Sequence, residues 1–120
     1  MTVQECINRF NYLKPHGYDD ETLAKWIRSL EERIYEEIIS WHEGAEAFKP
    51  SPGQDTEQEL IIPDAYADVY IYYLQAQADY FNAETGRYNN SMTMFNTALS
   101  GFADAFNRAH PPKKREVAYL

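Results

Sequence analysis

Cysteine is nearly absent from this sequence, which holds only Cys6 among its 120 residues. One thiol cannot form a disulfide within the chain, and the missing disulfides favour a reducing, cytosolic environment. A chain of this length can bury a core large enough to hold its fold without disulfides or metal. Cys6 lies among apolar neighbours in a segment with helical spacing, so we expect a small core residue rather than a reactive thiol.

Long hydrophobic runs are missing as well. No window approaches the roughly 18 apolar residues of a membrane-spanning helix, and the opening MTVQECINRF lacks the apolar stretch of a secretory signal. We therefore expect no membrane partner and no cleaved leader. The sequence Asn89-Asn90-Ser91 matches a glycosylation sequon, but without a secretory signal we interpret it as a chance match.

The residue patterns that hold metals or carry out catalysis are also absent. No histidine has an acidic residue three places before it, so the Glu-x-x-His pairs of a di-iron bundle are missing. One cysteine and three scattered histidines do not make a zinc site, and no nucleophile elbow or glycine-rich phosphate loop is present. The sequence predicts no catalytic residue, no cofactor, no metal and no small-molecule substrate, and hence a protein that is not an enzyme.

One acidic cluster is the exception to this pattern. Glu31, Glu32, Glu36 and Glu37 lie close together on a predicted helix, and paired carboxylates can perform acid–base chemistry. They lie largely off the apolar stripe of that helix, and nearby arginines can pair with them. We expect a solvated helix face rather than a catalytic pair.

Basic residues are scarce except near the end of the chain. Residues 1–107 contain 7 basic and 18 acidic residues, whereas residues 108–120 contain four basic residues and one acidic residue. A body this acidic repels phosphate backbones, so we expect DNA to pass it without specific binding. Residues 111–120 are expected to form a flexible basic tail, or alternatively an arm that docks on an acidic neighbouring subunit.

The sequence contains 10 tyrosines, and many of its apolar and aromatic residues recur with helical spacing. Two stripes with steps of three and four predict helix faces, one made mainly of tyrosines in residues 64–83 and one rich in phenylalanine in residues 87–109. Together with helices at residues 3–13 and 20–42, they predict an all-α, four-helix bundle-like domain over residues 1–110. A single kinked helix is the alternative to a hairpin of the last two helices.

Local signals mark where these helices begin and end. Thr2 opens a capping box, and Asp19 is a good N-cap for the second helix. Gly44 is expected to end that helix. Residues 44–62 then form a long connection, whose two prolines argue against regular structure. Its apolar end, Leu60–Ile62, is expected to be extended and held by packing or by a neighbouring subunit.

Long stretches of the chain resemble one protein family. The run LIIPDAYADVYIYYLQAQADYFNAETGRYNNSMTMFNTALSGFADAFNRAHPP, together with YDDETLAKWI and RIYEEII, is similar to head–tail connector (adaptor) proteins of tailed bacteriophages and of prophages in Gram-positive gut bacteria. The similarity covers roughly residues 1–112 and is strongest over 63–77 and 87–107. The proline-containing loop, Gly86 and the basic tail depart from the family's pattern.

The resemblance implies a structural subunit that forms a homo-oligomeric ring, expected to be a dodecamer, below the capsid portal. The ring would extend the DNA channel, contact the portal and the tail-completion proteins, and reside in the virion after assembly in the cytoplasm of a bacterial host. A ring subunit uses two different, complementary patches. The residues expected to contact neighbours are Trp41, Leu60, Ile61, Ile62, Tyr72, Lys113, Lys114 and Arg115.

A second hypothesis, from a different class of protein, fits the same residues. A small helical module with a tyrosine-rich face could bind or regulate a partner protein while acting as a monomer or dimer. Assembly that depends on concentration is expected of a ring subunit and not of such a module.

Overall fold

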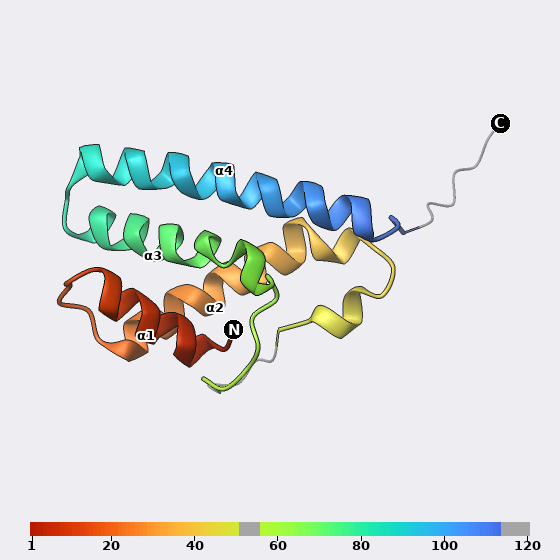
Figure 1. Cartoon of the computed structure of the whole chain (residues 1–120), viewed down its shortest axis with the longest axis horizontal. Helices are drawn as coiled ribbons and strands as arrows, with labels where there is room; N and C mark the ends of the chain where they lie inside the picture. The colour runs from red at the N-terminus through yellow and green to blue at the C-terminus, as the bar shows by residue number, and fades with distance from the viewer. Residues whose placement is uncertain (51–55, 114–120) are drawn as a thin grey trace.

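The computed structural model of this protein describes residues 1–50 and 56–113, and these residues form an all-α, bundle-like fold (Figure 1). The predicted fold class is confirmed: within the described ranges there are four α-helices and no strand beyond two isolated β-bridges. Three short 3₁₀ turns lie between the second and third of these helices. The elements in chain order are α1 (Val3–Leu13), α2 (Asp20–Glu37), η1 (Ile39–Trp41), η2 (Ala45–Phe48), η3 (Asp64–Tyr66), α3 (Asp68–Phe81) and α4 (Thr85–Ala109).

The first two helices begin at the predicted caps. The Thr2 hydroxyl accepts a hydrogen bond from the Glu5 backbone N–H at 3.1 Å, and the Asp19 carboxylate accepts one from the Thr22 N–H at 2.8 Å. Each bond satisfies a donor that has no partner within its helix.

The second helix is shorter than predicted, because α2 ends at Glu37 and not near His42. Two side chains satisfy carbonyl groups at this end: the Ser40 hydroxyl donates to the Glu36 carbonyl, and the His42 ring contacts the Ile38 carbonyl. The chain continues through the 3₁₀ turn η1. Gly44, with φ of +77°, then takes the left-handed conformation that glycine adopts without strain, and η2 follows it.

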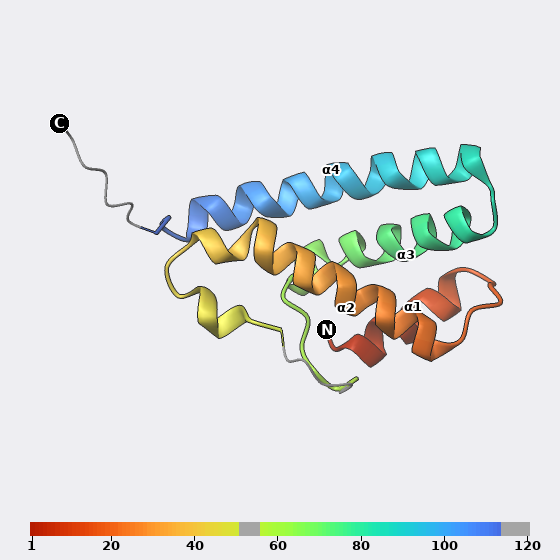
Figure 2. The same ribbon diagram turned by 180° about the vertical axis from the view of Figure 1, so that it is seen from behind.

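α3 is the central helix of the molecule. It contacts α1 and α2 on one side and α4 on the other, an arrangement visible in Figure 1 and, from behind, in Figure 2. A helix enclosed in this way is apolar around most of its circumference. Its buried residues accordingly come from several faces: Val69, Tyr70, Ile71, Leu74, Ala76, Ala78 and Asp79.

α3 and α4 form an antiparallel hairpin, so the alternative of one kinked helix is wrong. The turn lies at residues 82–84, where Ala83 has a positive φ of 57°. α4 is the outer layer, and only Ser91, Phe95, Phe102 and Phe106 of its 25 residues are buried. Most of its surface therefore faces outward.

The hydrophobic core lies mainly between α1, α2 and α3. Cys6 is fully buried there, as predicted, and burial raises the pKa of its thiol to about 12. The largest fully buried side chains are Ile7, Phe10, Leu23, Ile27, Leu30, Ile34, Ile39, Ile62, Val69, Tyr70, Leu74 and Phe95.

The end of the long connection is held by the start of the chain. The N–H groups of Val3 and Gln4 donate to the carbonyls of Gln58 and Thr56, at 3.1 and 2.8 Å, and the Leu60 N–H donates to the carbonyl of Met1 at 2.9 Å. Residues 56–60 thus pair with the first turn of α1 and satisfy two of its free N–H groups. Contacts within the chain hold this segment in place.

Candidate interaction surfaces

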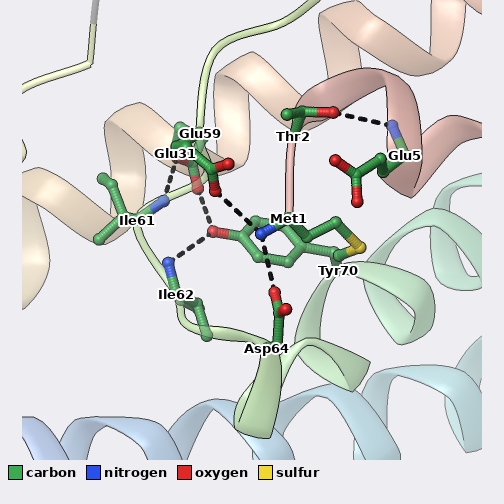
Figure 3. Close-up of polar contacts among 9 residues, drawn as sticks. All are labelled: Met1, Thr2, Glu5, Glu31, Glu59, Ile61, Ile62, Asp64 and Tyr70. Atoms are coloured by element: carbon green, nitrogen blue, oxygen red, sulfur yellow. Dashed lines mark hydrogen bonds and ion pairs between the residues drawn. The ribbon is translucent and has the colours of Figure 1, made fainter.

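A buried polar network joins α2, α3 and the end of the long connection (Figure 3). The Tyr70 hydroxyl donates to one carboxylate oxygen of Glu31, and the Ile61 N–H donates to the other at 2.9 Å. The Ile62 N–H donates in turn to the Tyr70 hydroxyl at 3.0 Å. Two backbone donors of an otherwise apolar segment are therefore satisfied by side chains from two helices.

The prediction that Glu31 belongs to a solvated helix face is wrong, since its side chain is 5 % exposed. The residue lies on the side of α2 that residues 60–62 cover, and periodicity along α2 alone does not reveal that cover. Burial raises the pKa of the Glu31 carboxyl to about 7, while the hydrogen bonds from Tyr70 and Ile61 act in the opposite direction.

A carboxyl group with a raised pKa is a candidate for acid–base chemistry, and the geometry around Glu31 shows how its oxygens are used. Both oxygens accept hydrogen bonds from the chain itself. The adjoining cavity, which Arg28 and Glu32 also line, has a volume of about 40 Å³, room for little more than water. We assign Glu31 the structural task of holding residues 61 and 62 against the helices.

A second buried acid, Asp79, links three helices. Its carboxylate is 1 % exposed and pairs with the ammonium group of Lys14, the residue that caps the C-terminal end of α1, at 2.9 Å and with the hydroxyl of Ser91 on α4 at 2.8 Å. This pairing satisfies a charge that would otherwise be costly to bury. Asp79 was not among the residues predicted from the sequence. Its one signal was an acidic residue in a helix that is apolar around most of its circumference.

Residues 1–50 and 56–113 contain neither a metal-ligand cluster nor a membrane-spanning helix. No group of three or more His, Cys, Asp or Glu side chains in these ranges is placed to hold a metal ion. None of the helices described there combines the length and the apolar character needed to cross a bilayer.

An apolar groove with a volume of about 300 Å³ lies beside the C-terminal part of α4. Phe102 and Phe106, which are themselves buried, line its base. Phe48 contacts Phe106 edge-on at a centroid distance of 5.7 Å, and the His110 ring stacks on Phe106 at 3.9 Å. We call this feature the α4 groove. It is lined by Phe48, Ile61, Pro63, Tyr66, Phe102, Ala105, Phe106, Ala109 and His110.

A second set of exposed apolar side chains lies at the C-terminal ends of α1 and α3, and the end of α3 leads into the α3–α4 turn. We call it the aromatic end and define it by Tyr12, Leu13, Tyr80 and Phe81, whose exposed fractions are 90, 53, 61 and 59 %. Phe81 also stacks on Trp26 with parallel rings at 5.6 Å. Large apolar side chains gathered on a surface mark a place where another molecule can bind.

The predicted contact residues fall into different environments. Trp41 is 60 % exposed and Tyr72 is half-buried. Leu60 and Ile62 are buried in the core of the chain. Of this segment, Ile61 is partly exposed and lines the α4 groove, so it is the residue that another molecule could contact. Of the three basic residues, Lys113 is described, whereas Lys114 and Arg115 lie outside the described residues.

The first three residues of the predicted tail are bonded to the body. The Glu43 N–H donates to the carbonyl of Pro111 at 3.1 Å, and the Lys113 N–H donates to the carbonyl of Trp41 at 2.9 Å. Between them, Pro112 and His42 form an antiparallel bridge. The rest of the tail, residues 114–120, is not among the described residues.

The α4 groove was only partly foreseeable from sequence. Phe102 and Phe106 belong to the predicted stripe of the last helix, but Phe48 and Ile61 reach the groove through the fold of the long connection.

Comparison of the chain with protein-family models, with curated proteins and with solved structures finds no match.

Proposed function

We propose that this protein is a non-enzymatic structural subunit that associates with copies of itself through two different surfaces. The observation that carries the proposal is the presence of the α4 groove and the aromatic end on one small chain. Both are apolar; one lies beside the C-terminal part of α4, and the other lies at the C-terminal ends of α1 and α3. Contacts between unlike patches propagate from one copy to the next and close into a ring or extend as a filament.

The resemblance of the sequence to head–tail connector proteins supports a more specific form of this proposal. In that form, the copies make a ring, proposed to be a dodecamer, between the portal and the tail-completion proteins of a bacteriophage. The formal net charge of −8 suits the wall of a channel through which DNA passes without adhering. The virion would then be the place where the protein acts.

The α4 groove also favours the second hypothesis, a helical module that binds a partner protein. A groove that presents apolar side chains between helical elements suits an apolar segment of another protein. In that case the chain stays a monomer or dimer at every concentration, and the groove serves the partner alone.

Native mass spectrometry over a concentration series separates the two hypotheses. We expect oligomers larger than a dimer to grow with protein concentration. The variant Tyr80→Ser at the aromatic end should weaken them, because it removes apolar surface without touching the core. Met94→Ser is the matched control, since Met94 is exposed on α4 and belongs to neither surface. A wild-type chain that remains monomeric or dimeric throughout would support the partner-binding module instead.

A further inference from the structure

We propose that Ile61 and Ile62 form a pH-dependent latch, which Glu31 holds closed while its carboxyl group is protonated and releases when the ionised carboxylate turns toward Arg28. In the closed form, which the structure shows, both residues lie against α2 and α3. In the open form they leave these helices. The switch operates within a single chain, so it does not depend on the association of copies.

A single carboxyl group holds the latch closed (Figure 3). One of its oxygens accepts the Ile61 N–H at 2.9 Å, and the other accepts the hydroxyl of Tyr70, which itself accepts the Ile62 N–H at 3.0 Å. If the carboxyl group of Glu31 turns away, the Ile61 N–H and the Tyr70 hydroxyl lose their acceptor together. Buried donors without acceptors are costly, so the two residues of the latch must move to where water can reach them.

The groups that face Glu31 from α1 and α3 favour its neutral form. The carboxyl is nearly enclosed, and burial raises its pKa to about 7. On α1 the buried Cys6 thiol has a pKa raised to about 12, and on α3 burial raises the pKa of Tyr70 well above its usual value, so both are uncharged at neutral pH. The guanidinium of Arg9 on α1 pairs with Asp68 at 3.4 Å. No cation from these two helices therefore neutralises an ionised Glu31 in the closed form.

Arg28 is the cation that an ionised Glu31 can reach. The other positive group nearby, the Met1 ammonium, pairs with Glu59 and Asp64 at 2.9 and 2.7 Å. Arg28 lies one helical turn before Glu31 on α2 and lines the same cavity, and it makes no ion pair within the described residues. Residues three apart on a helix are neighbours on its surface. The remaining acidic groups in this region, Glu5, Glu32 and Glu59, add only negative charge.

The cavity beside Glu31 gives the carboxylate a place to turn. Its volume of about 40 Å³ has room for water, and it lies between α2, the start of α1 and the end of the long connection. A carboxylate that turns into this space gains water and the Arg28 guanidinium, and the backbone of α2 does not need to move.

The release is confined to Ile61 and Ile62. The preceding residues are fixed by backbone bonds to the first turn of α1 that do not involve Glu31, such as the bond from the Leu60 N–H to the Met1 carbonyl at 2.9 Å. Ile61 also lines the α4 groove, so opening of the latch would alter that surface above neutral pH.

Amide hydrogen exchange measured by NMR at pH 5 and pH 8, corrected for base catalysis of exchange, tests the latch. At pH 5 the amides of Ile61 and Ile62 should be protected. At pH 8 they should exchange within about tenfold of the rate of an unstructured peptide, whereas the amides of Leu60 and Leu74 should stay protected. If Ile61 and Ile62 remain as protected as Leu60 and Leu74 at pH 8, they open only with the whole fold and the proposal is wrong.

Three variants identify the groups that operate the latch. Glu31→Gln cannot ionise, so Ile61 and Ile62 should stay protected at pH 8. Arg28→Gln removes the cation, so the loss of protection should require a higher pH than in the wild type. Arg33→Gln is the matched control and should behave as the wild type, because it removes the same charge from α2 at a residue that pairs with Glu37 at 3.2 Å and does not line the cavity.

Two results with these variants would overturn the proposal. Loss of protection at pH 8 in Glu31→Gln would show that another group triggers the opening. Identical pH dependence in Arg28→Gln and Arg33→Gln would show that the carboxylate does not turn toward Arg28. Thermal unfolding at pH 5 checks that each variant is folded, and the half-buried Arg28 provides a test even if Glu31→Gln does not fold.

Discussion

At the scale of single residues, Glu31 shows how a charged side chain can serve the core. Its two oxygens accept the Ile61 N–H and the Tyr70 hydroxyl, and so they satisfy donors that packing against apolar groups would leave without partners. This arrangement requires the desolvation of a carboxyl group, and that desolvation raises the pKa of Glu31 to about 7. The stability of the fold should therefore depend on pH through this one residue.

We expect Glu31 to make the free energy of unfolding fall as the pH rises from 4.5 to 7. The unfolded chain releases this proton near the ordinary pKa of 4.5, whereas the folded chain keeps it until about pH 7. Across that window the folded state binds more protons, so raising the pH favours unfolding, by roughly 3 kcal/mol for the full shift. Above pH 7 this contribution stays constant.

The variant Glu31→Gln tests this dependence, because the amide cannot ionise. Urea unfolding at several pH values between about 5 and 8 should show a shallower pH dependence for Glu31→Gln than for the wild type. Glu32→Gln, at the exposed neighbouring position, should retain the wild-type dependence. Equal slopes for wild type and Glu31→Gln would mean that the carboxyl titrates as an ordinary solvated group in the folded protein.

At the scale of elements, the sequence predicts the helices well because their signals are local. The caps at Thr2 and Asp19 and the spacing of apolar residues act within a few positions of one another. The end of α2 was placed too late, because apolar spacing continues through η1 although the backbone tightens into a 3₁₀ turn. The burial of Glu31 and the shape of the groove depend on residues about 30 or more positions apart, which no local pattern encodes.

The tyrosine stripe of α3 shows the same limit. It predicts one buried face, but α3 is covered on both sides, so burial does not follow the stripe. Tyr70 is fully buried, whereas Tyr80 on the same stripe is 61 % exposed because it lies at the end of the helix next to the turn. The position of a residue along the hairpin decides its burial as much as its helical phase does.

The outer helix allows a direct test of its exposed face. Gly101 lies inside α4, and an added Cβ atom there would meet no atom within 4 Å. Gly101→Ala should raise the free energy of unfolding by about 0.5–1 kcal/mol, because alanine restricts the unfolded chain and favours helix.

Gly44→Ala should instead lower the free energy of unfolding, by about 1–2 kcal/mol, because Gly44 has a φ of +77°, which an alanine adopts only with strain. Denaturant unfolding measures both, and a destabilised Gly101→Ala would contradict the described α4.

At the scale of the whole molecule, α3 divides the structure into two unequal layers. α1 and α2 pack on one side of it around most of the core, whereas α4 packs along the other side and buries only four of its 25 residues. Less apolar burial leaves a layer easier to open. We expect amide hydrogen exchange to be faster over residues 85–100 of α4 than over residues 69–78 of α3. Equal protection in both ranges would show that the hairpin opens as one unit.

The single cysteine allows the opening of one of these layers to be measured by chemical labelling. Because Cys6 is fully buried in the layer built by α1 and α2, a thiol reagent such as a maleimide can modify it only after that layer opens. The rate at which Cys6 is labelled in the wild-type protein therefore reports how often this layer opens, and no probe has to be introduced. If α4 alone detaches, labelling should stay slow. If the layer of α1 and α2 opens, labelling should become faster.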